Sequence, residues 1–241
     1  MNGQRRIRIL SRLVGDTAPG GETERLCQVS AEVTGMSGAG IMLMSDDVLR
    51  GSVCTTNEVS ALIEELQYGL GEGPCVDAYH LDRPVLEPDL AHARLPRWPA
   101  FSPPALEAGV GAIFGFPLRV GAVRLGALNL YRVRSGSLAD EAHADALVMA
   151  DIAAQALLVM QAGAPLGSLG AELEAAGEFH YGVHQASGMV AVQLEVGVGQ
   201  ALIRLRAYAF GHDRPLAQVA EDVVARRLRF DDRSGEKDPV P

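Results

Sequence analysis

Lysine, cysteine, aromatic residues and long apolar runs are all scarce in this 241-residue sequence. Only Lys237 among the 21 basic residues is a lysine, and the formal net charge at pH 7 is −9. That balance argues against a protein that coats nucleic acid through bulk charge, but it does not exclude a local basic patch. Arg119 and Asp151 interrupt the longest apolar stretches, so none reaches the ~18 residues of a membrane span. We therefore expect no membrane-embedded segment.

The three cysteines, Cys27, Cys54 and Cys75, form no CxxC pair and no cluster with histidine at zinc-ligand spacing. The basic start of the chain, Met1 to Leu13, lacks the apolar region of a secretion signal. We therefore expect three free thiols in a reducing cytoplasm, with neither a structural metal nor another cofactor.

Apolar periodicity predicts an α+β arrangement for the first part of the chain. Helical spacing predicts helices over residues 22–33, 58–67 and 138–161. Short apolar runs bounded by turns predict strands over residues 39–44, 48–55, 84–86, 112–119 and 125–133. The helix over 138–161 is apolar on two sides, which favours burial of its second side against a partner subunit in a homodimer.

Composition divides the chain into two domains joined by a linker. Gly and Pro gather in residues 163–170, and three short helical stripes follow, none able to bury its apolar side alone. The stripes consist of Val183, Ala186, Val190 and Leu194, then Ala201, Leu205 and Ala209, then Leu216, Val219, Ala220 and Val223. The predicted boundaries are an N-terminal segment over 1–19, a first domain over 20–162, the linker, a second domain over 171–230 and a disordered tail over 231–241.

The element order, together with a glycine-rich turn at Leu70–Ala78 (LGEGPCVDA), resembles the GAF domain. Gly71 and Gly73 permit positive φ in this turn, and Pro74 can open a helix that carries Cys75. The resemblance implies an antiparallel sheet flanked by helices that senses a small molecule or a protein. The candidate ligand pocket is lined by Met42, Met44, Cys75, Tyr79, Phe114 and Phe116. The alternative is that these side chains are core and that Cys75 is an inert buried thiol.

The C-terminal segment carries three motifs that together resemble the ANTAR domain. They are HQASGMV at 184–190, ALIRLRAYA at 201–209 and RPLAQVAEDVV at 214–224. The resemblance implies a three-helix module that binds paired hexaloop hairpins in nascent messenger RNA and prevents transcription termination. A sensor domain would gate this binding through dimerisation. The residues that would contact RNA are Gln185, Ser187, Gly188, Arg204, Arg206, Tyr208 and Arg214.

Local chemistry agrees with RNA binding at this end of the chain. Residues 180–230 have a net charge of +2, from six arginines against four acidic residues. Arg204 and Tyr208 lie four residues apart, hence on one helix face, where a guanidinium and an aromatic ring can grip phosphate and stack on a splayed base. The alternative is that Tyr208 and Gly188 serve bundle packing and that the arginines at 226–229 form a solvated last turn.

This sequence also departs from the ANTAR pattern at a few positions. Ser187 stands where a lysine is common, so one phosphate contact is missing. Gly197 and Gln200 stand where a Ser or Thr cap and an acidic residue are common, although glycine can still cap a helix at little loss. The departures put single contact residues in doubt rather than the domain.

The sequence therefore predicts a cytoplasmic, non-enzymatic regulator with a GAF sensor and an ANTAR bundle. One alternative is a ligand- or redox-responsive module whose helical bundle binds a protein. Another is a helix-turn-helix that reads duplex DNA. A third is an enzymatic GAF domain such as a methionine sulfoxide reductase, which would need a resolving thiol close to the attacking one.

Overall fold

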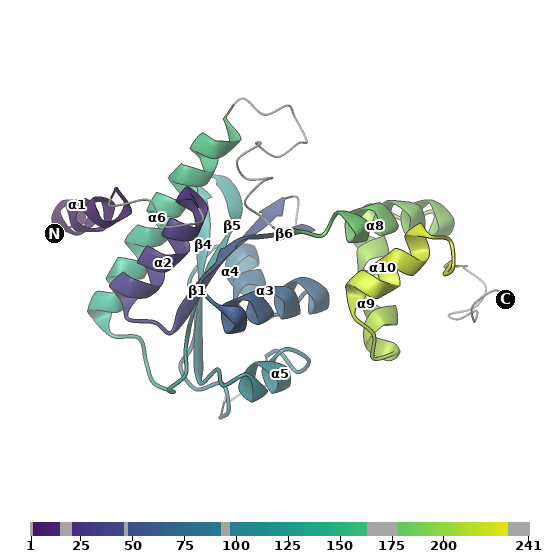
Figure 1. Cartoon of the computed structure of the whole chain (residues 1–241), viewed down its shortest axis with the longest axis horizontal. Coiled ribbons are helices and arrows are strands. Elements are labelled where there is room, and N and C mark those ends of the chain that lie inside the picture. The colour runs from purple at the N-terminus through teal and green to yellow at the C-terminus, as the bar shows by residue number, and fades with distance from the viewer. Residues whose placement is uncertain (1, 15–20, 46–47, 93–96, 163–177, 231–241) are drawn as a thin grey trace. The chain divides into compact units, whose positions relative to one another are not determined.

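The computed structural model describes residues 2–14, 21–45, 48–92, 97–162 and 178–230. The chain divides into two compact units, residues 1–179 and 180–241, which are described separately (Figure 1). The predicted linker at 163–170, the predicted domain start at 171 and the predicted tail at 231–241 lie outside the described residues.

The first unit is an α+β domain, as the periodicity predicts. Its helices are α1 (Asn2–Leu13), α2 (Glu22–Thr34), α3 (Glu58–Leu70), α4 (Pro74–Leu81), α5 (Ser102–Glu107) and α6 (Asp140–Gln161). Its strands are β1 (Gly38–Ser45), β2 (Val48–Thr55), β3 (Val85–Glu87), β4 (Ala112–Val120), β5 (Val123–Arg132) and β6 (Glu178–Phe179). Helices α1 and α5 and strand β6 were not among the predicted elements.

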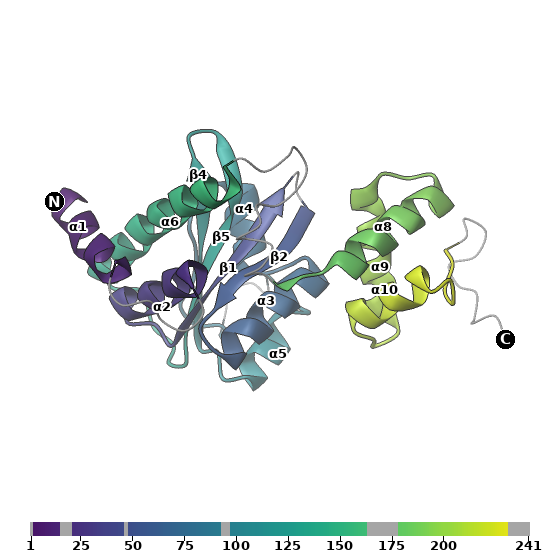
Figure 2. The same cartoon turned by 45° about the horizontal axis from the view of Figure 1, so that its top comes forward.

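The six strands form one antiparallel sheet in the order β3-β4-β5-β1-β2-β6. Alternation along the strands sends residues to opposite faces. Ile41, Phe114 and Leu128 face α2 and α6 and belong to the main hydrophobic core. The opposite face is covered by α3 and α4, and Figures 1 and 2 show helices on either side of the sheet.

Local signals fix the ends of the helices next to the second face. Asn57 accepts a hydrogen bond from the Ser60 amide (2.9 Å), and the Ser60 hydroxyl accepts one from the Asn57 amide (2.9 Å), so α3 begins with a capping box. α3 ends at Gly71, whose φ of 70° suits glycine. Pro74 then opens α4 at its first turn, as the sequence predicts.

Helix α1 packs against α2 and α6 through an ion-paired side and a buried isoleucine. Asp145 of α6 pairs with Arg8 (2.6 Å) and Arg5 (3.2 Å), and Asp145 is itself buried. Ile9 lies fully buried in the main core. The basic N-terminal segment is therefore an integral layer of the first unit.

This arrangement changes the interpretation of the two-sided helix α6. Its second apolar side was predicted to be buried by a partner subunit, but Ile152 is already buried within the chain. Arg6 of α1 also reaches the outer side, where it donates to Gln155 (2.7 Å). Leu147 and Val159 of α6 remain exposed. Much of the apolar surface that suggested a dimer is thus covered by the chain itself.

The prediction of three free thiols is wrong for two of them. Cys27 of α2 and Cys54 of β2 form a disulfide, and Cys75 is the free cysteine, buried on α4. Packing of α2 on the sheet brings the two Cα atoms to 6.1 Å, within the range that a disulfide requires. Residues 27 positions apart in sequence give no signal of this proximity.

The second unit holds the three helices that the sequence predicts. They are α8 (Tyr181–Leu194), α9 (Val198–Gly211) and α10 (Leu216–Val224), and they pack on one another (Figure 2). The three predicted apolar stripes supply most of the buried side chains of this unit, Val190, Leu205 and Val219 among them. Each helix thus buries its apolar side against the other two helices, which a single helix could not do alone.

Helix α6 is long and apolar enough to cross a membrane. The bent pair α8–α9 also has the required length and apolar composition if the two helices are counted as one segment. One side of α6 packs on the sheet in the main hydrophobic core, and Asp145 and Asp151 lie along the helix.

Candidate functional site

A row of three residues across the centre of the sheet forms the floor of a polar site. Asn129 of β5 pairs in register with Gly40 of β1 on one side and with Gly115 of β4 on the other. Asn129 is fully buried, and these positions face α3 and α4. The two glycines remove the side chains that would normally flank it, which lets the covering helices approach the sheet backbone.

Each glycine makes room for one specific neighbour. A Cβ at Gly40 would lie 2.6 Å from a carboxylate oxygen of Glu64. A Cβ at Gly115 would collide with the backbone of Pro74 and Cys75 at the start of α4. Neither glycine has positive φ, so close approach is the reason for both.

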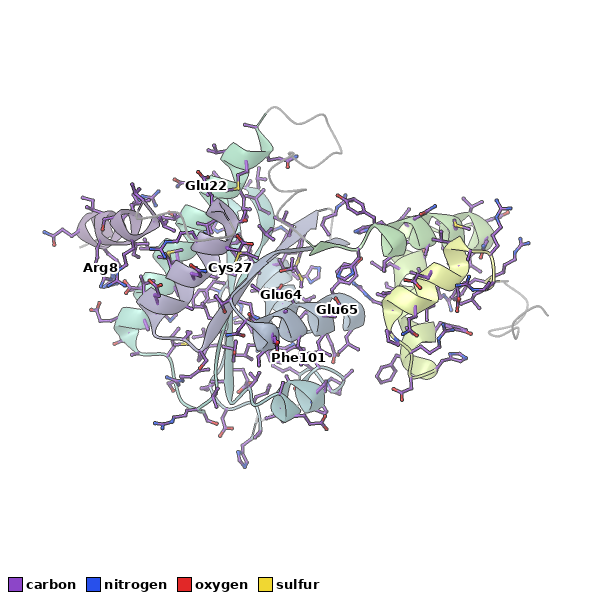
Figure 3. All side chains as sticks on the ribbon, viewed as in Figure 1. Arg8, Glu22, Cys27, Glu64, Glu65 and Phe101 are labelled. Atoms are coloured by element: carbon purple, nitrogen blue, oxygen red, sulfur yellow. A yellow bond between two sulfur atoms is a disulfide. The ribbon has the colours of Figure 1, made fainter. Side chains whose placement is uncertain are left out.

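Helix α3 contributes two polar side chains to this face. Glu64 and Gln67 are one turn apart, and their exposed fractions are 2% and 0%. The side-chain oxygen of Gln67 accepts a hydrogen bond from the backbone amide of Cys75 (2.8 Å) and so ties α3 to α4. Figure 3 shows Glu64 beside its neighbour Glu65, which is solvent-exposed.

The cluster has more hydrogen-bonding capacity than its described neighbours satisfy. The Asn129 amide is the hydrogen-bond partner of the Glu64 carboxyl on this face, whereas the nitrogen of Gln67 is buried without a hydrogen-bond partner among the described residues. A buried unpaired polar atom costs about 1–3 kcal/mol.

Burial also changes the acidity of the groups in the cluster. Desolvation raises the pKa of Glu64 to about 8, while its hydrogen bond to the Asn129 amide lowers the pKa by a smaller amount. The pKa of the Cys75 thiol is raised well above its usual value, mainly by burial and then by the charge of Glu64, against a smaller opposing effect of Gln67. Glu64 is therefore largely protonated near neutral pH, and Cys75 is a thiol rather than a nucleophilic thiolate.

The two acids of the Leu70–Ala78 turn hold a covering segment in place. Glu72 accepts hydrogen bonds from the backbone amides of Ala100 (2.7 Å) and Phe101 (2.8 Å). Asp77 pairs with Arg97 (2.8 Å) and accepts from the Trp98 indole (3.1 Å). Residues 97–101 are thereby fastened to α4 just before α5 begins, near the labelled Phe101 in Figure 3.

The six predicted pocket residues do not gather in one place. Met42 and Cys75 lie on the face that carries Asn129, and Tyr79 lies on α4 with its ring beneath the Arg124 guanidinium (4.8 Å). Phe114 and Phe116 point to the opposite face and belong to the main core. Met44, near the end of β1, is buried as well.

Sequence reasoning missed Glu64, Gln67 and Asn129. A signal was present, because Asn129 interrupts an apolar strand and the two α3 residues are polar on a side that packs on a sheet. The three cysteines are divided between the two faces of the sheet. Cys27 and Cys54 belong to the main hydrophobic core, whereas Cys75 lies against the other face. The Cys75 thiol and the Cys27–Cys54 disulfide thus lie on opposite faces of the sheet.

In the second unit, several predicted RNA contacts have structural partners. Ser187 is buried and its hydroxyl donates to the Val183 carbonyl (2.7 Å). Arg214 pairs with Asp222 (2.6 Å), which also binds Arg227 (2.7 Å) and whose pKa is lowered by these hydrogen bonds. Ser187, Arg214 and Arg227 thus make contacts that stabilise the three-helix bundle.

Other predicted contacts lie at the surface. Gln185 and Arg204 are exposed, and Arg206 is half-buried. Tyr208 is half-buried and stacks on His212, with ring centroids 3.9 Å apart. A Cβ at Gly188 would meet nothing within 4 Å, so helix packing does not explain that glycine.

The first unit is thus an α+β domain with a polar cluster enclosed between its sheet and covering helices. The family model for the GAF domain matches residues 23–158, and the chain belongs to the GAF domain family. The match ends before the second unit, so the ANTAR assignment stays a prediction.

One solved structure agrees on the fold, and a second is reported for its similarity alone. The GAF domain of a phosphoenolpyruvate-protein phosphotransferase from Coxiella burnetii is 15% identical, with a TM-score of 0.50 over 67% of this chain and 95% of that one. A domain of a two-component sensor histidine kinase protein from Sinorhizobium meliloti 1021 is 18% identical, with a TM-score of 0.49 over 61% and 95%. Comparison with curated proteins gives no match.

Proposed function

We propose that this chain is a transcription antitermination regulator whose GAF domain senses a small molecule and controls RNA binding by the C-terminal helices. The RNA is messenger RNA with paired hairpin loops, as the ANTAR-like motifs imply. The proposal assigns binding, not catalysis, to both units.

The outward side of α9 is the observation that carries the RNA part of the proposal. Ile203 and Phe210 are 62% and 68% exposed, and their seven-residue spacing puts them on one side of the helix. Arg206 lies four residues before Phe210 and so on the same side of α9, and the exposed Arg204 lies four residues before Tyr208. An exposed aromatic ring next to a guanidinium is the combination that stacks an unpaired base and holds its phosphate. Sequence reasoning missed both apolar residues.

We also propose that the chain acts as a homodimer, because paired hairpins present two equivalent sites. The exposed Leu147 and Val159 on α6 offer apolar surface for such contact. Analytical ultracentrifugation of the full chain tests it, and a concentration-independent monomer would refute it.

The test of RNA binding is a titration of the full chain against a paired-hexaloop RNA at several salt concentrations. Loop-scrambled RNA and duplex DNA serve as competitors. Arg204→Ala should weaken binding and reduce the salt slope by about one phosphate contact. Phe210→Ala should weaken binding about 5- to 150-fold, the range that loss of one base stack gives.

Two matched controls lie on the same chain. Arg83→Ala removes an exposed arginine of the first unit, and Val192→Ala trims an exposed side chain of α8. Both should leave RNA affinity unchanged. If loop-scrambled RNA binds equally well, the assignment is wrong; if duplex DNA is preferred, the helices read DNA. If no nucleic acid binds, the exposed apolar side of α9 instead favours docking of a protein.

A further inference from the structure

The segment that follows α10 folds back onto the three-helix bundle. α10 ends at Val224, and Arg226 has a left-handed φ of 62°, so the chain reverses its direction there. The backbone amides of Arg227 and Leu228 then both donate to the Asp222 carbonyl (2.8 and 3.1 Å), and the Leu228 side chain is buried. The arginines of this segment therefore belong to an ordered reversal of the chain rather than to a solvated last turn of the helix.

The end of this segment completes a cluster of aromatic rings with α9. The Phe230 amide donates to the side-chain oxygen of Gln193 on α8 (2.9 Å), and the Phe230 ring makes a T-shaped contact with the Tyr208 ring, with centroids 5.5 Å apart. Tyr208 in turn stacks on His212, whose Nδ1 lies 2.8 Å from the Tyr208 carbonyl oxygen. Tyr208, His212 and Phe230 are called the ring cluster below.

Two exposed arginines lie next to the ring cluster. Arg204 is one turn before Tyr208 on α9, and Arg229 directly precedes Phe230. Within the part of the chain that the structure describes, no carboxylate pairs with either guanidinium, because the ion pairs of Asp222 use other arginines. Two positive charges are thus available beside the rings.

Arg229 is held between two anchored residues. Leu228 before it is buried, and the amide of Phe230 after it is hydrogen-bonded to Gln193. The backbone at Arg229 is therefore fixed while its side chain is exposed. Because less chain has to be ordered on binding, such an arginine binds a phosphate at a smaller entropic cost than one in a free chain end.

We propose that Arg229 and the ring cluster form a second RNA contact of this unit, in addition to the outward side of α9, and that this contact takes one unpaired nucleotide. The base stacks on the exposed His212 ring and so extends the stack that His212 makes with Tyr208. The phosphate of the same nucleotide binds the Arg229 guanidinium. The inference rests on the RNA binding proposed above and names a further part of the surface that performs it.

The chemistry of this surface favours single-stranded RNA over other partners. A base has the flat π-face that prolongs a stack of rings, whereas an acidic peptide offers carboxylates without it. A guanidinium matches the oxygens of a phosphate with paired N–H donors. A duplex keeps its bases inside its own stack, so it offers phosphates to Arg229 but no base to His212. An unpaired loop nucleotide supplies both groups.

The experiment titrates the full chain with two RNA probes, the paired-hexaloop RNA and single-stranded hexauridylate, at several salt concentrations. Arg229→Gln and His212→Ala are the test variants. Arg83→Gln and His92→Ala are the matched controls, because each changes an exposed side chain of the same type in the first unit. Arg229→Lys tests rescue by a residue that keeps the charge.

Arg229→Gln should bind both probes about fivefold more weakly and lower the salt slope by about 0.7, as loss of one phosphate contact to a single strand gives. Arg229→Lys should restore the salt slope, because a lysine also neutralises a phosphate. His212→Ala should weaken binding at least about fivefold through loss of one base stack. Both controls should bind as the wild type does.

Wild-type affinity in either test variant would overturn the proposal, and so would equal weakening in the matched controls. His212 contacts the Tyr208 carbonyl, so circular dichroism checks that His212→Ala keeps its helices. Arg229→Gln changes an exposed side chain and tests the proposal whatever that check shows.

The two probes and the earlier variants separate this proposal from the proposed function. If Arg204→Ala and Phe210→Ala weaken binding but Arg229→Gln and His212→Ala do not, the RNA-binding role stands and the second contact is refuted. If hexauridylate binds through Arg229 and His212 but the paired-hexaloop RNA does not bind, the second contact is supported and the antitermination role is refuted. Binding of neither probe refutes both.

Discussion

Replacing Glu64 by glutamine should make the first unit more stable at high pH. The raised folded-state pKa means that the folded domain holds the Glu64 proton more tightly than the unfolded chain does. The associated stability is complete below the unfolded pKa of about 4.5, falls as pH rises, and is fully lost above about 8. The span of about 3.5 pH units corresponds to about 5 kcal/mol at 1.36 kcal/mol per unit.

The assay is urea unfolding followed by tryptophan fluorescence at pH values from 5 to 9. Trp98 is the single tryptophan of the chain and is 2% exposed in the first unit, so its emission reports on that unit without interference from the helices at 180–230. Wild type should lose stability relative to Glu64→Gln by roughly 1.4 kcal/mol per pH unit between about 5 and 8.

The matched variant Glu65→Gln removes an exposed carboxylate from the next position of α3 and should lose stability with rising pH as the wild type does, apart from a constant offset for the contact that Glu65 itself makes. Subtracting the two variants cancels the titration of all other groups. A difference that stays flat from pH 5 to pH 9 would refute the reasoning, because it would mean that Glu64 ionises as easily in the folded domain as in the unfolded chain.

Three further predictions concern stability. Glu72→Ala should cost about 1–3 kcal/mol by releasing two backbone amides of residues 97–101, whereas Glu107→Ala on α5 should cost almost nothing, both read from Trp98 fluorescence. Gly115→Ala should destabilise the first unit by about 3 kcal/mol because its Cβ collides with backbone, whereas Gly188→Ala should stabilise α8 by up to about 1 kcal/mol, seen as slower amide exchange. Reducing the α2–β2 disulfide should lower stability by about 3–4 kcal/mol and expose two new alkylatable thiols on unfolding; an unchanged urea midpoint would contradict it.

The element pattern of the first unit was predictable because its strands and long helix carry strong apolar periodicity. The predicted strand over 112–119 is β4 (Ala112–Val120), and the predicted helix over 138–161 is α6 (Asp140–Gln161). Helix α1 was missed because its arginines mask the single buried Ile9. Strand β6 was missed because a two-residue strand has no period.

The candidate site could not be assembled from the sequence because it depends on register. Alternation within a strand separates its two sides, but it does not say which side of one strand shares a sheet face with which side of another. Phe114 was therefore grouped with Met42, although the two point to opposite faces of the sheet. Placing Asn129 between Gly40 and Gly115 requires two strand pairings whose offsets the sequence does not encode locally. The same holds for the proximity of the two disulfide cysteines.

The glycine-rich turn at Leu70–Ala78 connects the polar cluster to the outer cover of the domain. At its start, α3 supplies Glu64 and Gln67, and the Gln67 oxygen binds the amide of Cys75. Within the turn and helix α4, Glu72 and Asp77 hold residues 97–101. The Gln67 side chain therefore positions α4, and the turn with α4 in turn holds the segment that carries Trp98. The motif thus connects the buried polar cluster between sheet and helices to the segment at 97–101.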